Sequence, residues 1–96
     1  MSERIQSTAA GLAVSGDMTL ETAPALLAEG IEAFSVAEPV FDLAAVAEVD
    51  SSGLAVLFGW LRAAGAQGKT LRIANPPQNL LSLAEVYGVG ELLPLS

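Results

Sequence analysis

The chain has 96 residues, of which 52% are hydrophobic, and a formal net charge of −7 with only four Lys and Arg. This balance suits one small domain with a packed core and some apolar surface left for a partner, and it excludes a nucleic-acid interface, which needs clustered cations. The chain contains no Cys and no His, so we expect no disulfide, no metal site and no cofactor.

Strand patterns occur in three parts of the chain. Residues 4–16 read as one or two short strands around a tight turn, and Gly16 is expected to end the second. Residues 39–46 are apolar apart from one Asp, which predicts a central strand covered on both faces of its sheet. A further strand is predicted over residues 69–75, with its apolar side chains facing the same way.

Helix patterns occur over residues 19–34 and 75–88. In the first, Thr22 is the expected N-cap. Its predicted apolar face consists of Leu20, Leu27, Ile31 and Phe34. In the second, Asn75 is the expected N-cap and Gly88 the stop. Its predicted buried face consists of Leu80, Leu81, Ala84 and Tyr87. The last eight residues are expected to lie against an edge of the sheet.

A third helix is expected to begin near Ser51 and to end near Gly65 or Gly68. The side chains expected to pack on the sheet are Leu54, Leu57, Phe58, Leu61 and Ala64. The opposite face carries Ser52, Val56, Gly59, Trp60 and Ala63. A solvated face would carry Lys, Glu and Gln, so we expect this small, apolar face to dock a partner with Trp60 as its anchor. The alternative is that Trp60 packs beneath a loop or against a second copy of the chain.

The two serines at this helix start could be a nucleophile, a phosphate acceptor or a cap. A serine nucleophile needs a base, and Glu48, Asp50 and Lys69 stand in no recognisable triad spacing. No glycine-rich phosphate-binding motif matches either. We therefore expect no catalytic residue and no enzyme activity, whereas the Ser51 hydroxyl could cap the helix or accept a phosphate favoured by the helix dipole.

The order of these elements is strand, strand, helix, strand, helix, strand, helix, which predicts an α/β domain with at least part of the sheet parallel. Three stretches resemble the STAS domain family: "LAVSGDMTLETAPALL", "VFDLAAVAEVDSSGLAVLFGWLRAAGAQGKTLRI" and "NPPQNLLSLAEVYGVGELLPLS". The resemblance covers essentially the whole chain. It implies a single STAS domain over residues 1–96, with a small mixed sheet and helices packed mainly on one side.

Two branches of the family are similar to this chain. The first is the MlaB-type STAS subunit of the Mla phospholipid-transport ABC complex, which implies a regulatory partner role with the ATPase subunit of the transporter. The second is the anti-sigma-factor antagonists, which implies phosphorylation of Ser51 by an anti-sigma factor kinase. The family's G-E-L-D turn reads Gly16-Asp17-Met18-Thr19 here. The antagonists carry an acid at the position of Thr19, near the kinase-facing loop, so its loss favours the first branch.

In both branches the resemblance makes Ser51 the key hydroxyl. The residues expected to bind a partner are Asp50, Ser51, Ser52, Gly53, Val56, Gly59, Trp60 and Ala63. No segment looks like a signal peptide or approaches the roughly 18 apolar residues of a membrane span. We therefore expect a cytoplasmic protein without direct membrane insertion, peripheral at the inner membrane through its partner complex. A homodimer is compatible with the sequence.

Overall fold

The computed structural model describes residues 4–8, 11–33 and 40–95. Its four-stranded sheet has the order β1 (Ile5–Thr8), β2 (Gly11–Met18), β3 (Val40–Val49), β4 (Arg72–Ala74). Strand β1 is antiparallel to β2, whereas β2, β3 and β4 are mutually parallel. The helices are α1 (Ala23–Ala33), α2 (Ser51–Ala66), α3 (Gln78–Val86) and a 3-10 turn, η1 (Gly90–Leu92). The predicted α/β order and the mixed sheet are confirmed.

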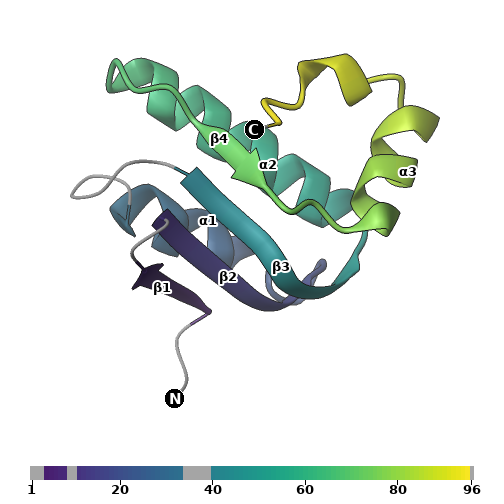
Figure 1. Cartoon of the computed structure of the whole chain (residues 1–96), viewed down its shortest axis with the longest axis horizontal. Helices are drawn as coiled ribbons and strands as arrows, with labels where there is room; N and C mark the ends of the chain where they lie inside the picture. Colours follow the sequence, from purple (N-terminus) through teal and green to yellow (C-terminus); the bar gives the residue numbers. More distant parts are fainter. Residues whose placement is uncertain (1–3, 9–10, 34–39, 96) are drawn as a thin grey trace.

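Helices α1 and α2 lie behind the sheet on one face, and α3 stands at the end of the sheet where α2 begins (Figure 1). Both helices connect parallel strands, and right-handed crossovers place such helices on the same face. The expectation that residues 39–46 are covered on both sides is wrong for the described part. On the other face of β3, Asp42 is half-buried and Ala44 is exposed. Helices packed mainly on one side, as the family resemblance implied, are confirmed.

Trp60 lies at the centre of the core and not on an exposed face. Its side chain is 0% exposed, and its ring stacks on Phe41 of β3, with centroids 4.1 Å apart and planes 9° apart. The indole Nε1 donates to the carbonyls of Leu26 and Leu27 in α1, at 3.1 and 3.2 Å. A Cβ on Gly30 would overlap this indole, so α1 and α2 meet at van der Waals distance here. The expectation of an exposed Trp60 anchor is wrong.

The buried side of α2 is therefore turned toward α1 relative to the prediction. Leu54, Leu57 and Ala64 are buried as expected, but Val56 is also buried, at 4% exposure, and Phe58 is only half-buried. Two neighbouring surfaces cover this helix, because α2 packs on the sheet and on α1 at once. The apolar stripe of α2 is therefore wider than a helix that packs on the sheet alone would need.

The other helix faces differ from the prediction at their ends. Leu20 is 72% exposed and Tyr87 is 57% exposed, since each lies just outside the regular part of its helix. Leu80 and Ala84 are fully buried as predicted, whereas Leu27 and Ile31 are half-buried. Phe34, also predicted for the α1 face, lies outside the described residues.

Several turn residues act differently from their predicted roles. Gly16 does not end β2, which runs on to Met18; Gly16 instead has a φ of 85° at an irregularity of the strand pairing. Asn75 is not the cap of α3: it has a φ of 51°, and its amide donates to the Asp42 carboxylate at 3.0 Å. Gly88, with a φ of 68°, follows α3 as predicted. The chain end pairs with the outer edge of β4 through a parallel bridge between Ile73 and Leu95, which confirms the expected edge segment.

Thr22 stands directly before α1, where an N-cap was predicted. Its hydroxyl accepts the Thr19 N–H at 2.9 Å and donates to the Asp17 carbonyl at 2.8 Å. Thr19, which replaces the acid of the family pattern, is half-buried in this turn. The Thr22 hydroxyl therefore closes the turn between β2 and α1.

Candidate functional site

The start of α2 is capped by Asp50. One oxygen of its carboxylate accepts the N–H of Ser52 at 2.8 Å and that of Gly53 at 3.3 Å, which satisfies two backbone donors that a helix start leaves unpaired. Helix α2 begins at Ser51, immediately after this cap. Capping is therefore the role of Asp50, and the Ser51 hydroxyl is not needed for it.

The same carboxylate ties α2 to the turn before α1. The second oxygen of Asp50 accepts the Leu20 N–H at 3.1 Å, and the neighbouring Asp17 carboxylate accepts the Glu48 N–H at 3.2 Å. The ends of the parallel strands β2 and β3 are thereby held together. The starts of α1 and α2 consequently present one shared surface.

Hydrogen bonding lowers the pKa of Asp50. Partial desolvation raises it, and this is the largest single effect, but the backbone N–H groups of Leu20, Ser52 and Gly53 together outweigh it. The net pKa lies below the ordinary value of 3.8. Asp50 is therefore an ionised cap at neutral pH, with its oxygens engaged by backbone donors.

Ser51 is exposed and Ser52 is half-buried. Within residues 4–8, 11–33 and 40–95, neither hydroxyl makes a side-chain hydrogen bond. No general base is hydrogen-bonded to the Ser51 hydroxyl there, and these ranges contain no group of three or more acids that could hold a metal ion. What this helix start offers is a free hydroxyl on an exposed helix tip.

Two apolar concavities flank the exposed side of α2. The α1–α2 groove is lined by Ala23, Pro24, Leu27, Ser52, Ala55, Val56, Gly59 and Arg62. The α2–α3 pocket is lined by Ser51, Leu54, Ala55, Phe58, Tyr87 and Val89. Ala55 borders both concavities, so its small side chain forms a low divide between them. The apolar surface thus extends from α1 across α2 to the end of α3.

The residues predicted to bind a partner separate into two groups in the structure. Ser51, Ser52, Val56 and Gly59 line one or the other concavity, and Asp50 holds the helix start. Gly53 and Trp60 are buried, and Ala63 is half-buried against the core. A Cβ on Gly53 would overlap the Met18 carbonyl oxygen, so this glycine allows α2 to start close against β2.

The sequence analysis missed several side chains of this surface. Ala55 was assigned to neither face of α2, and Phe58 was assigned to the core. Tyr87, which lines the α2–α3 pocket, was likewise placed on a buried helix face and is instead exposed. A signal for Phe58 was available: at 100° per residue it lies closer to Ser51 and Ala55 than to Leu57 on the helix circumference.

The sequence of this chain is similar to a known protein family and to one of its members. The model of the family described as "Mlab, STAS domain" matches residues 1–94. The "Intermembrane phospholipid transport system binding protein MlaB" of Haemophilus influenzae is 35% identical over 51 residues, which cover 53% of this chain and 49% of that protein. The match thus spans about half the length of this curated relative.

A solved structure of the anti-sigma factor antagonist SpoIIAA in its unphosphorylated form has the same fold. It superposes with a TM-score of 0.68 at 16% sequence identity, over 88% of this chain and 76% of that one. Within the described ranges, no helix is both long and apolar enough to cross a membrane. With a family match over nearly its whole length and the corresponding fold, the chain belongs to the STAS domain family, in its MlaB-type branch.

Proposed function

We propose that this chain is a non-catalytic STAS subunit that binds and regulates the ATPase subunit of an ABC-type phospholipid transporter. Its membership of the MlaB-type branch supports this function, together with a relative named for intermembrane phospholipid transport. In this role the domain, residues 1–96, is peripheral at the inner membrane through its partner.

The observation that carries the proposal is the exposed surface at the start of α2. Ala55 borders both apolar concavities, Ser51 and Phe58 line the α2–α3 pocket, and Leu27 lines the α1–α2 groove. Large apolar patches on small domains mark sites of protein association. The residues proposed to contact the ATPase subunit are Ser51, Ser52, Val56 and Gly59 from the sequence analysis, with Ala55 and Phe58 added from the structure.

The chemistry of the site supports binding rather than catalysis. The carboxylate nearest to Ser51 in sequence, that of Asp50, accepts three backbone N–H groups and is held in the cap. The chain has no His and no Cys, which are the side chains most often used as general base or thiolate nucleophile near pH 7. A serine without a base is a weak nucleophile.

Replacement of Ala55 tests the surface. Ala55→Glu places a negative charge between the two concavities. Because Ala55 is an exposed position of α2, the fold is expected to persist. We expect it to abolish co-purification of the tagged chain with the ATPase subunit of the transporter from the same genome. Ala66→Glu is the matched control, because Ala66 is exposed on the same helix and lies about 16 Å further along it.

The control variant should bind as the wild type does. Circular dichroism should show that both variants keep the wild-type helix content. Retention of the ATPase subunit by folded Ala55→Glu would refute the proposed surface. Failure of the wild-type chain to bind the ATPase subunit would refute the proposed function.

A second candidate function is partner switching by phosphorylation of Ser51. It is favoured by the exposed hydroxyl at the first residue of α2, where Asp50 has already taken the capping role. Helix N-termini stabilise phosphate groups through their dipole and free N–H groups. Intact-protein mass spectrometry after incubation with ATP and a serine kinase encoded beside this chain should then show one added phosphate, absent in Ser51→Ala. An unchanged mass would refute this function.

A further inference from the structure

We infer that the ATPase subunit contributes an amphipathic α-helix that lies lengthwise in the α1–α2 groove, with a basic end toward Glu21 and an acidic residue toward Arg62. The identity of the partner rests on the proposed function. The form and charge of the docked segment rest on the groove itself.

The groove is long enough to hold a segment of α-helix. Its lining runs along α2 from Ser52 to Arg62, ten residues that span about 15 Å of helix axis. Pro24 and Leu27 of α1 form one wall. On the α2 side, Ser52 and Ala55 have small side chains that let a third helix approach closely, whereas the space over Gly59 is filled by the Leu27 side chain.

The backbone chemistry of the groove favours a helix over an extended segment. Helices α1 and α2 satisfy their own interior N–H and C=O groups, and the groove lies along their sides, away from any strand edge. A docked strand would lose water from backbone groups that find no partner there, which is unfavourable. A docked helix pairs its own backbone groups internally and needs only apolar side chains to fill the groove.

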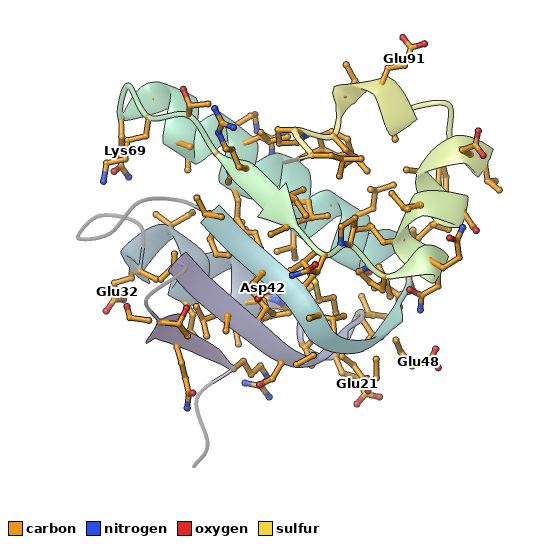
Figure 2. The ribbon with its side chains drawn as sticks, in the orientation of Figure 1. Glu21, Glu32, Asp42, Glu48, Lys69 and Glu91 are labelled. Atoms are coloured by element: carbon orange, nitrogen blue, oxygen red, sulfur yellow. The ribbon has the colours of Figure 1, made fainter. Side chains whose placement is uncertain are left out.

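The charges around the groove are opposite at its two ends. Glu21 lies just before Ala23, at the end where Ala23 and Ser52 line the groove, and Glu48 projects at the same end of the molecule (Figure 2). Both glutamates are exposed and form no ion pair within the described residues. Arg62, also exposed and without an ion pair there, lies at the other end. Charge complementarity therefore orients the docked helix.

Disulfide cross-linking tests this geometry, because the chain has no Cys of its own. Ser52→Cys and Arg62→Cys are each combined with single cysteines scanned through the contact segment of an otherwise cysteine-free ATPase subunit. Arg62→Cys removes one exposed charge, which should weaken binding by a few-fold at most, so this variant should still form the complex. Disulfides require Cα atoms about 4.4–6.8 Å apart, so they report close neighbours only.

We expect the two positions to trap sites about ten residues apart in one helical segment, with Lys or Arg beside the site trapped by Ser52→Cys. A spacing of about five residues would show an extended segment and overturn the inference. Trapping in two unrelated segments would overturn it as well. Ala66→Cys, outside the groove, should form no cross-link.

Charge reversal provides the second readout. Arg62→Glu should lower the affinity for the ATPase subunit about ten-fold at low salt, and replacement of the facing partner acid by Lys should restore it. An unchanged affinity of Arg62→Glu overturns the orientation while leaving the proposed function in place. Absence of any binding by the wild-type chain contradicts the proposed function instead, so the two failures are distinguishable.

Discussion

Trp60→Ala is expected to lower the free energy of unfolding of the whole domain and not merely to weaken a surface. The indole is fully buried, stacked on Phe41 and hydrogen-bonded to two carbonyls of α1. A buried Trp removes about 150–250 Å² from water, which at about 25 cal/mol per Å² corresponds to about 4–6 kcal/mol. Measured Trp-to-Ala replacements in cores cost about 3–5 kcal/mol, so we expect a loss of about 4 kcal/mol.

This loss is large relative to the stability of the domain. A chain of 96 residues has a free energy of unfolding of about 5–14 kcal/mol. Trp60→Phe keeps the stacking on Phe41 but loses the indole hydrogen bonds, and it should cost about 1–2 kcal/mol. Urea unfolding followed by circular dichroism, which does not require the Trp signal, measures all three proteins.

The control for this series is Tyr87→Ala, since Tyr87 is an aromatic residue that is 57% exposed. It should change the free energy of unfolding by no more than about 0.5 kcal/mol. If Trp60→Ala lowered the free energy of unfolding by less than about 1 kcal/mol, the indole would not hold α1, α2 and the sheet together. The core described for this domain would then be wrong.

Three further predictions follow from the same contacts. Gly30→Ala should lower the free energy of unfolding in urea by about 1–3 kcal/mol, because the added Cβ would overlap the Trp60 indole. Gly65→Ala is the matched control: its Cβ would meet nothing within 4 Å, so it should instead stabilise α2 by about 0.5–1 kcal/mol. Asp50→Ala should destabilise the fold at neutral pH, and this difference from wild type should shrink as the pH falls below 3.8 and through the lowered pKa of folded Asp50. The stabilisation is present above the ordinary pKa, because only the ionised carboxylate makes the cap at full strength, and it is lost in acid. A pH-independent difference in chemical denaturation would contradict this prediction. The fluorescence of the single Trp should resist acrylamide quenching in the folded protein, and quenching as efficient as in urea would contradict its burial.

The order of elements and the start of α2 were predictable from the sequence, because they depend on local patterns. Alternating apolar runs, Gly88 after α3, and the acid and two serines at the start of α2 act within a few residues of chain. The mixed sheet and the helices on one side followed from the STAS resemblance. These features are insensitive to which neighbour each helix finally contacts.

The faces of α2 were not predictable in the same way. The prediction from periodicity placed Leu57 on one face of α2 and Val56 and Trp60 on the opposite face, but periodicity does not show that α1 as well as the sheet covers the helix. The packing of α1 depends on Gly30, whose missing side chain makes room for the indole. A small residue on one helix opposite a Trp on another is a long-range pairing that a single sequence does not reveal.

The division of roles between Asp50 and Ser51 was also decided by geometry. Acids and serines are both good N-caps, so residue type alone left the cap open. The extended backbone of Asp50 lets its carboxylate reach Ser52 and Gly53 while also accepting the Leu20 N–H. Ser51 is thereby left exposed on the surface proposed to bind the ATPase subunit.

Cross-saturation NMR on the complex tests the central claim most directly. With the chain deuterated and 15N-labelled and the ATPase subunit protonated, saturation transfers only to amides close to the partner. If the proposed surface binds the ATPase subunit, the amides of Ser51, Ser52, Ala55 and Gly59 should lose the most intensity. The amides of β1 and of Asp42, on the open face of the sheet, should be unaffected. Intensity losses concentrated on β1 and the open sheet face, with α2 unchanged, would contradict the account.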